Sequence, residues 1–334
     1  MKAVYLTGTL EPLILKDFQI PQPEPDEVLI RLECSAFNHR DVWMQKGLYS
    51  GPKSGLIMGS DGCGVVEAVG PGGDHTLIGQ EVIINPSQNW GPDPAAFGKD
   101  FTILGNPSPG TFAEYISVSR QYVYPKPVHL SRPEAAALPL AGLTSYRALF
   151  TRGRLVAGEK VLVTGIGAGT ASIAMLMALA AGAEVYVTSS SDDKIAKAIA
   201  LGAKGGLNYN NPAWPESFKA QTGGFNVIID SASGKDFERL IDVAAPGGRI
   251  VVFGATGGPI GNILSRKIFW NSLSLLGTAM GTPKDFEEML DFVSRHRLSP
   301  VVDRVFTSLG HAQEALEYMS KGHQFGKIVM QNKV

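Results

Sequence analysis

The sequence has few cysteines, no excess of either charge and no long apolar run. Only Cys34 and Cys63 occur among its 334 residues, so a disulfide framework is excluded and a cytoplasmic protein with reduced thiols is expected. The formal net charge of -1, from 30 basic and 31 acidic residues, gives no support for a nucleic-acid or anionic-membrane partner. No apolar run reaches the roughly 18 residues of a membrane span, and the N-terminal residues lack a signal-peptide pattern.

The length and the patterning that remain indicate two domains of different character. Before residue 125, short β-runs such as "DEVLIRLECSAF", "GVVEAVG" and "QEVIINPS" are bounded by turn residues, which predicts a β-rich domain. Residues 85–110 are rich in proline and glycine and are expected to form an irregular lobe. A helix over 133–150 is predicted next, capped by Ser131 and kinked at Pro139.

From residue 160 onward, apolar strands alternate with helical segments. Near-continuous apolar strands separated by helices predict a parallel sheet covered on both faces, and so an α/β, doubly wound domain. The six expected strands begin near Lys160, Ala183, Gly206, Asn226, Arg249 and Leu273, and the helices between them cover 170–181, 192–201 and 235–244. A helix over 285–296, a strand, a second helix and the strand "FGKIVM" complete the chain.

A glycine-rich turn joins the first of these strands to its helix. Gly165, Gly167 and Gly169 allow backbone N–H groups to approach a pyrophosphate at a helix N-terminus. Glycines also serve plain tight turns, but the strand before and the helix after favour dinucleotide binding. Ala168 and Thr170 belong to the same turn, and Ala171 stands where close strand–helix packing usually requires glycine.

The end of the second strand favours NADPH over NADH. A carboxylate at this point normally binds the ribose hydroxyls, whereas this chain has the run Thr188–Ser191 and no acid before Asp192. Ser189, Ser190 and Lys194 offer hydroxyl donors and a positive charge to a 2′-phosphate. The alternative is an ordinary serine-rich helix cap, in which the acids of the first turn complement the helix dipole.

Taken in order, the motifs resemble the medium-chain dehydrogenase/reductase superfamily, most closely its zinc-free quinone-oxidoreductase-like (zinc-type alcohol dehydrogenase-like) branch. They include "SAFNHRDVWMQKG", "GSDGCGVVEAVG", "LPLAGLTSYRAL", "IIDSASG", "PGGRIVVFGATGG" and "HQFGKIVM". The resemblance implies a GroES-like β-barrel catalytic domain, residues 1–127 with a return at 277–334. It further implies a Rossmann domain over 128–276, with a six-stranded parallel sheet, and a substrate cleft between the domains.

The resemblance also implies that both zinc sites of similar alcohol dehydrogenases are absent. Those enzymes carry a cysteine where Asn38 stands, a histidine and a glutamate at Ser60 and Asp61, and a cysteine near Leu140. Zinc requires thiolate, imidazole or carboxylate in a tetrahedral set, so Asp61 alone cannot hold it. The 85–110 lobe lacks the four cysteines of the structural site.

Four candidate catalytic residues follow from the resemblance, each with a structural alternative. Asn38 binds the cofactor ribose or a substrate carbonyl, or it stabilises a turn. Arg40 binds a substrate carbonyl or a cofactor phosphate, or it is an exposed loop arginine. Ser60 donates to the substrate or packs in the core, and Thr144 lies beside the nicotinamide or bonds to its own helix. Asp41 is expected to cap the short helix that follows.

The resemblance places further cofactor contacts along the chain. Tyr209 is expected on the adenosine side, and Lys327 is expected at the pyrophosphate unless it is a surface lysine. On the nicotinamide side the expected contacts are Phe253, Gly254, Ala255, Thr256, Gly277 and Thr278. Tyr49 and Trp90 are candidates for stacking on a planar substrate, although loop aromatics often only pack.

Together these features predict an NADPH-dependent, zinc-independent oxidoreductase that transfers hydride to a quinone or an α,β-unsaturated carbonyl. The alternatives are a metal-free aldehyde or alcohol oxidoreductase and a non-catalytic NADPH-binding redox sensor.

A homodimer is expected as well. The uncharged apolar segment 271–277 is the predicted edge strand of the sheet, and such an edge is normally covered or paired.

Overall fold

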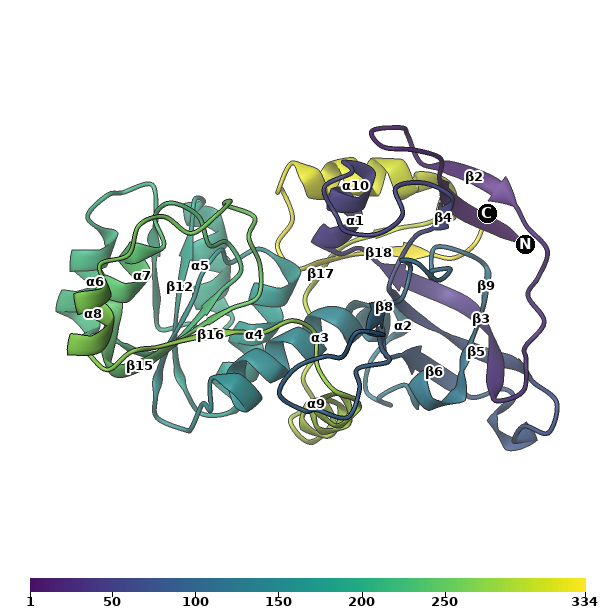
Figure 1. Ribbon diagram of the computed structural model, residues 1–334, viewed down its shortest axis with the longest axis horizontal. Coiled ribbons are helices and arrows are strands. Elements are labelled where there is room, and N and C mark those ends of the chain that lie inside the picture. Colours follow the sequence, from purple (N-terminus) through teal and green to yellow (C-terminus); the bar gives the residue numbers. More distant parts are fainter. The chain divides into compact units, whose positions relative to one another are not determined.

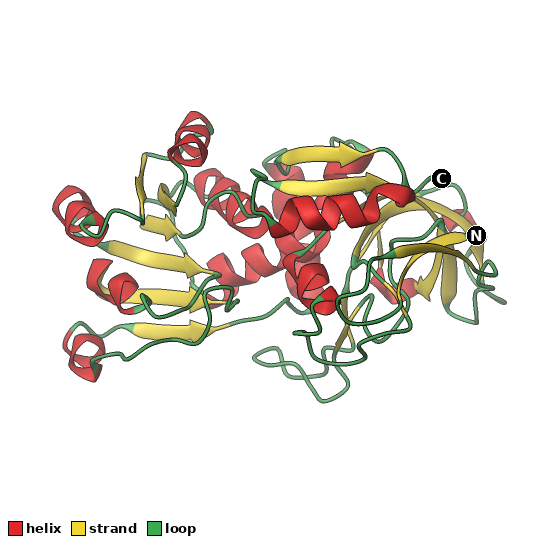
Figure 2. Cartoon of the chain, turned by 90° about the horizontal axis from the view of Figure 1, so that it is seen from above, coloured by secondary structure: helices red, strands yellow, loops and turns green.

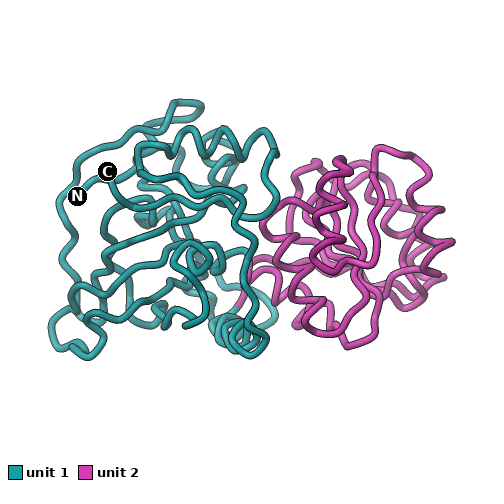
Figure 3. Tube along the Cα trace, turned by 180° about the vertical axis from the view of Figure 1, so that it is seen from behind, with its two compact units in different colours: residues 1–141, 282–334 teal, residues 142–281 magenta.

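The computed structural model describes every residue from Met1 to Val334, and the chain divides into two compact units (Figure 3). Unit 1 contains Met1–Ala141 and Thr282–Val334, and unit 2 contains Gly142–Gly281. The chain thus leaves unit 1 once, forms unit 2 and returns. Both points of division fall later in the sequence than the expected domain limits at residues 127 and 277. None of the helices combines the length and the apolar character needed to cross a membrane.

Unit 1 is built on antiparallel strands around β3, Glu27–Ala36. The other strands of its N-terminal part are β1 (Lys2–Leu6), β2 (Ile14–Asp17), β4 (Leu56–Ile57), β5 (Asp61–Val69), β6 (Glu81–Ile84), β7 (Ser87–Gln88), β8 (Thr102–Ile103), β9 (Tyr115–Ser119) and β10 (Val123–Pro125). β3 pairs with both β5 and β9, and β5 pairs with β6. These elements confirm the three β-runs predicted from the sequence. The irregular lobe contains only the short β7–β8 pair.

The C-terminal segment returns to the same sheet. It forms α9 (Pro283–Arg295), β17 (Val302–Phe306), α10 (Ala312–Ser320) and β18 (Lys327–Gln331). β18 pairs antiparallel with β3, with Val329 opposite Ala36, and the two strands lie side by side in Figure 1. The N–H of Phe37 donates to the carbonyl of Ile328 at 3.0 Å. The first residues of β18 are thereby held against the end of β3.

A short helix, α1 (His39–Gln45), begins directly after β3. Asn38 is its N-cap residue, and the backbone N–H of Asn38 donates to Asp41 Oδ2 at 2.8 Å. This bond satisfies a backbone donor at the helix start and confirms the capping role expected for Asp41. The side chains at positions 38 and 40 thus stand on a fixed turn.

The turn before β5 requires glycine. Gly59 has φ of 96°, and a Cβ there would collide with the ring of Phe112. A Cβ on Gly110 would collide with the backbone carbonyl of Gly59. The close approach of these two segments fixes the backbone that presents Ser60 and Asp61 at the start of β5.

Two helices lead into unit 2. α2 (Arg132–Ala137) begins with a capping box, in which Ser131 Oγ accepts from the N–H of Glu134. α3 (Pro139–Tyr146) starts at Pro139 and continues into a π-helical turn over Arg147–Arg152. The predicted kink is therefore a break between two helices, because proline cannot donate to the preceding turn.

Unit 2 contains a six-stranded parallel sheet in the order β13-β12-β11-β14-β15-β16. Figure 2 shows its strands as arrows side by side. The strands are β11 (Lys160–Val163), β12 (Glu184–Ser189), β13 (Gly205–Asn208), β14 (Phe225–Asp230), β15 (Ala244–Val252) and β16 (Ser274–Gly277), which confirms all six predicted strands. Val161, Leu162 and Val163 are all fully buried, as expected for a strand covered on both faces.

Five helices belong to this sheet: α4 (Gly169–Ala180), α5 (Asp192–Ala200), α6 (Trp214–Thr222), α7 (Glu238–Val243) and α8 (Ser265–Trp270). α4, α5 and α7 correspond to the predicted helices. α6 and α8 were not predicted from the sequence. α6 carries a proline in its first turn, and α8 is six residues long with no buried residue, so neither has a clear apolar period.

Candidate functional site

The glycine-rich turn in unit 2 has the geometry of an anion-binding turn. Gly165 and Gly167 have φ of 63° and 117°, and a Cβ built on Gly165 meets no atom within 4 Å. A side chain there would fill the space above the turn. α4 then begins after Ala168, which supplies no side-chain cap, so the N–H groups of its first turn lack a side-chain acceptor. These features fit the pyrophosphate of a dinucleotide.

The first turn of α4 is packed as the sequence predicts. Ala171 is 2% exposed, which is consistent with a small residue at the close strand–helix contact. The carbonyl of Thr170 accepts from Ser145 Oγ at 3.0 Å. The backbone of the turn is thus fixed before any ligand binds.

The proposed selectivity residues do not share one environment. Ser189 is 3% exposed, and its Oγ donates to the carbonyl of Ile166 at 3.2 Å and accepts from the N–H of Ser191 at 3.2 Å. Its expected phosphate contact therefore needs correction, because the hydroxyl ties the strand end to the glycine-rich turn. Ser190 is exposed. The side chain of Lys194 extends over the turn, since a Cβ on Gly167 would lie 3.0 Å from its Nζ.

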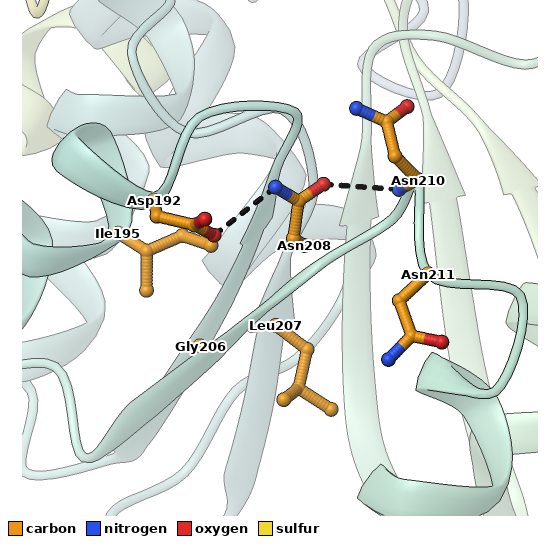
Figure 4. Close-up of a pocket in the computed structure, with 7 residues that line it drawn as sticks. All are labelled: Asp192, Ile195, Gly206, Leu207, Asn208, Asn210 and Asn211. Carbon is orange, nitrogen blue, oxygen red and sulfur yellow. Dashed lines mark hydrogen bonds between the residues drawn. The ribbon is translucent and has the colours of Figure 1, made fainter.

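A surface pocket lies at the carboxyl end of β13. It is lined by Asp192, Ile195, Gly206, Leu207, Asn208, Asn210 and Asn211 (Figure 4). Asn208 Nδ2 donates to Asp192 Oδ1 at 3.0 Å and to the carbonyl of Ser190 at 3.2 Å. Asn208 thereby holds the Asp192 carboxylate and fixes the loop of Ser190. Asn208 was not predicted from the sequence as a functional residue, although it ends an expected strand.

A buried carboxylate also orders the loops beside the glycine-rich turn. Asp230 ends β14, and its carboxylate accepts from Thr164 Oγ1 at 2.6 Å and from the N–H of Ser233 at 2.7 Å. Burial raises the pKa of Asp230, and these hydrogen bonds oppose the rise. Asp230 connects the strand before the glycine-rich turn to the neighbouring loop. Its signal in the sequence is an acid at the end of the apolar run "NVIID".

The expected nicotinamide-side residues lie on loops at the same ends of the strands. Gly254 follows β15, and a Cβ there would collide with the carbonyl of Ser231. The nearby expected residues are Phe253, Ala255 and Thr256. Thr278 follows β16, and its Oγ1 is buried without a hydrogen-bond partner. This hydroxyl is the atom of the group best suited to a cofactor contact, since a buried unpaired polar atom is unfavourable until a ligand satisfies it.

The other expected cofactor residues of unit 2 are placed as follows. Thr144, in α3, is 6% exposed, with its Oγ1 3.9 Å from the sulfur of Met280. Tyr209 is 44% exposed, and its N–H donates to the carbonyl of Ser189. Gly277 ends β16 and has open space where a Cβ would stand.

In unit 1, Lys327 forms a buried ion pair with Asp61. The ammonium is 2.9 Å from Asp61 Oδ2 and 2.7 Å from Asn38 Oδ1, and Asn38 Nδ2 also donates to Asp61 Oδ2 at 2.8 Å. The exposed fractions are 2% for the Lys327 side chain and 0% for that of Asp61. Lys327 is therefore not a surface lysine. Two of its three protons are committed within unit 1, which leaves one for the expected cofactor contact.

The donor set at this position does not fit a zinc ion. The N–H of Leu140 donates to Asp61 Oδ1 at 2.8 Å, so the structure brings Asn38, Asp61 and Leu140 together, as the resemblance implies. Both carboxylate oxygens of Asp61 already accept hydrogen bonds, one of them from a cation. No three histidine, cysteine or acidic side chains gather in the chain to hold a metal, and zinc requires such a set.

Arg40 is buried next to this cluster and is not an exposed loop arginine. It is 8% exposed, and its Nη1 donates to Ser60 Oγ and to the carbonyl of Leu104, the latter at 2.8 Å. Ser60 Oγ itself donates to the same carbonyl at 2.8 Å. Arg40 Nε and Nη2 have no hydrogen-bond partner. The guanidinium therefore has one satisfied side and one unsatisfied edge.

The surrounding groups fix the guanidinium in place. The Tyr49 ring lies 4.8 Å from Arg40 Cζ, a cation–π contact. Burial raises the pKa of Asp41 to about 6, while Arg40 and the N–H of Asn38 act to lower it.

Trp90 packs edge-on against Phe97 and Phe101 and is 4% exposed, so its stacking on a substrate is not supported.

The comparisons with known proteins agree with both units. Residues 24–128 match the model of the alcohol dehydrogenase GroES-like domain, and residues 169–295 match that of the zinc-binding dehydrogenase. The chain is 38% identical to the zinc-type alcohol dehydrogenase-like protein YogA of Leptosphaeria maculans, over 96% of this chain and 94% of that protein. It is 32% identical to the zinc-type alcohol dehydrogenase-like protein C1773.06c of Schizosaccharomyces pombe, over 94% of each.

A solved structure of a protein described as an NAD-dependent alcohol dehydrogenase is similar along the whole chain. Its TM-score is 0.92 at 37% identity, and 99% of each chain is covered. The glycine-rich turn and these matches support a pyridine nucleotide as the cofactor. The chain belongs to the medium-chain dehydrogenase/reductase superfamily, in the zinc-type alcohol dehydrogenase-like branch, and it is an oxidoreductase of that type.

Proposed function

We propose that this protein is an NADPH-dependent, zinc-independent reductase that transfers hydride to a quinone or an α,β-unsaturated carbonyl. The observation that carries the proposal is the buried Lys327–Asp61 pair with Asn38, which lies where similar enzymes are expected to hold catalytic zinc. Without a metal, no Lewis acid stabilises the oxygen of a simple alcohol or ketone. An acceptor that is already electron-poor has less need of that stabilisation.

The residues of each unit have separate tasks in this proposal. When bound, NADPH supplies the hydride, and the acceptor takes up one proton to complete its reduction. Unit 2 holds the pyrophosphate at the turn of Gly165 and Gly167. In unit 1, Arg40 binds an oxygen atom of the substrate, Ser60 holds Arg40 and the carbonyl of Leu104, and Lys327 keeps Asn38 and Asp61 in place. Fixed hydrogen-bond donors aimed at a developing negative charge lower the barrier to transfer.

Two other functions remain as alternatives. The relatives are named as alcohol dehydrogenases or as similar to them, which favours a metal-free aldehyde or alcohol oxidoreductase. A non-catalytic NADPH-binding sensor would keep the cofactor turn of unit 2 without turnover. Because the buried thiols Cys34 and Cys63 are free, all three functions are proposed for the cytoplasm.

The first prediction concerns the acceptor. With NADPH, purified protein should reduce para-benzoquinone or methyl vinyl ketone, and it should oxidise ethanol with NADP+ at least about tenfold more slowly, a barrier difference of about 1.4 kcal/mol. Initial rates measured by NADPH absorbance, before and after dialysis against EDTA and phenanthroline, provide the test. Turnover with alcohols alone, or loss of activity on chelation that added zinc restores, would contradict the proposal.

The cofactor preference rests on exposed Ser190 and on Lys194. No carboxylate lies at the end of β12 itself, and the nearest one, Asp192, begins α5 with its Oδ1 accepting from Asn208. The ammonium of Lys194 over the glycine-rich turn favours an added phosphate, since charge-assisted hydrogen bonds are the stronger kind. A solved relative is described as NAD-dependent, so we propose that this chain differs from that protein in its cofactor.

The second prediction is that NADPH binds at least about tenfold more tightly than NADH, a difference of about 1.4 kcal/mol. Lys194→Ala should remove most of that difference, and Ser190→Asp should reverse it by like-charge repulsion. Ser189→Asp is unsuitable, because it would bury an acid among backbone groups. Lys197→Ala, an exposed lysine of the same helix, is the matched control. Calorimetry giving equal affinities for the two cofactors in the unmodified protein would overturn the assignment.

We further propose a homodimer joined along β16. The sheet order places β16 at an edge of the parallel sheet, and Leu275 on this strand is 40% exposed. Just before it in sequence, Phe269 and Trp270 are 66% and 84% exposed. An apolar edge strand with exposed aromatic neighbours is typical of a surface that pairs with a second copy.

The third prediction tests this interface. Leu275→Lys should convert the dimer to a monomer at micromolar concentration, because a charged side chain on an edge strand opposes strand pairing. Val128→Lys, at a position 96% exposed in unit 1, should leave the dimer intact. Sedimentation velocity distinguishes the two species. A monomer for the unmodified protein would refute the dimer.

A further inference from the structure

We propose that Arg40 is a carboxylate-binding residue, and that the acceptors of this protein are enones or quinones that carry a carboxylate. The inference rests on the proposed reductase function and names the substrate class of the same site. It starts from the unused edge of a buried guanidinium. That edge consists of two adjacent N–H donors, Nε and Nη2, both buried and both without a partner.

The other side of the guanidinium is fully used by the protein. Nη1 donates to both Ser60 Oγ and the carbonyl of Leu104, so the orientation of the group is set before a ligand arrives. One face lies against the Tyr49 ring, whose centroid is 4.8 Å from Arg40 Cζ. The direction of the unused edge is therefore determined by the fold.

No carboxylate of the protein satisfies this edge. Arg40 takes part in none of the ion pairs of the structure. Asp61 is committed to Lys327 at 2.9 Å. Asp41, the next residue along the chain, uses Oδ2 to accept from the N–H of Asn38. It attracts the guanidinium through space but makes no hydrogen bond with it.

The geometry of the edge selects the ligand chemistry. Nε–H and the neighbouring Nη2–H point the same way and are spaced to meet the two oxygens of one carboxylate in a bidentate pair. A single carbonyl oxygen could meet both donors only in a bifurcated contact, and it would bring no negative charge to the guanidinium. Because guanidinium stays protonated in proteins, a buried edge of this kind is most favourable when a planar anion occupies it.

Entry to this edge requires a local shift, since both donor atoms are covered by protein. The neighbouring segment 46–55, which carries Tyr49, has glycines with positive φ at Gly47, Gly51 and Gly55. Most of its residues are exposed. A displacement of this segment would move the partly buried Tyr49 ring away from the core residues that it packs against and would open a path to the edge.

The test compares β-acetylacrylate, an enone acid, with its methyl ester, which has the same enone and no charge. Reduction of the carbon–carbon double bond takes one hydride from NADPH and one proton from water, forms two C–H bonds, and gives levulinate or its ester with NADP+. We expect kcat/KM for the acid to exceed that for the ester by at least about tenfold. Arg40→Lys should bring the ratio close to one, because an ammonium keeps the charge but not the two-point contact.

A matched variant separates this role from a general loss of cationic charge. Arg304 also lies over a tyrosine ring, 4.6 Å from the centroid of Tyr318, but it is exposed. Arg304→Lys should leave the acid-to-ester ratio unchanged. Binding of levulinate to the NADP+ complex, measured by calorimetry, gives a readout that needs no turnover. It should be detected in the unmodified protein and lost in Arg40→Lys, with folding checked by circular dichroism.

The outcomes separate the two proposals. If acid and ester are reduced equally well, the carboxylate site is overturned and the reductase function stands. If neither is reduced but levulinate binds in an Arg40-dependent manner, the reductase function fails and the carboxylate site stands. If levulinate binds equally to the unmodified protein and to Arg40→Lys, or to neither, the assignment of Arg40 is overturned.

Discussion

The hydrogen-bonded ion pair between Lys327 and Asp61 is the interaction on which the site of unit 1 depends. A charged lysine side chain that is 2% exposed is stable only when its charge is paired and most of its donors are hydrogen-bonded. Asp61 supplies the opposite charge and Asn38 supplies a second acceptor, although they lie 266 and 289 residues away from Lys327 in the sequence. Pairing of β18 with β3 brings the two ends of the chain together, and the glycines around residue 59 set the backbone of Asp61.

The same pair defines which chemistry the site can support. Asp61 accepts from Lys327, from Asn38 and from the N–H of Leu140, so it has little capacity left for a metal. In the proposed metal-free reaction, we infer that Lys327 supplies the fixed positive charge that a metal supplies in similar zinc enzymes. Lys327 has only one uncommitted proton, whereas a catalytic zinc keeps an open coordination position for a substrate oxygen. Substrate binding then falls to other donors, of which Arg40 has the unused ones.

Much of the fold could be predicted because its signals are local. Five of the six strands of the parallel sheet contain short apolar runs, β13 with its sequence GGLN being the exception, and the glycine-rich turn is recognisable between a strand and a helix. The cap at Ser131 and the one formed by Asp41 depend on residues three positions apart. Helices α6 and α8 were missed because one is mostly polar and the other buries nothing.

The details of the site could not be predicted, because they depend on contacts between distant segments. Whether Lys327 lies at the surface or in the core is decided by the pairing of β18 with β3. The burial of Arg40 depends on the carbonyl of Leu104, in a lobe without regular sequence patterning. Ser189 and Ser190 are neighbours of the same type, yet strand geometry buries one and exposes the other.

The most direct test of this account is a double-mutant cycle on Lys327 and Asp61, measured as free energies of unfolding in urea. Lys327→Met and Asp61→Asn should each destabilise the protein by about 3 to 5 kcal/mol, because each leaves a buried charge unpaired. The double variant should be more stable than the sum of the single effects predicts, by roughly 1 to 3 kcal/mol. Small single effects that simply add would show that the pair does not hold the site together.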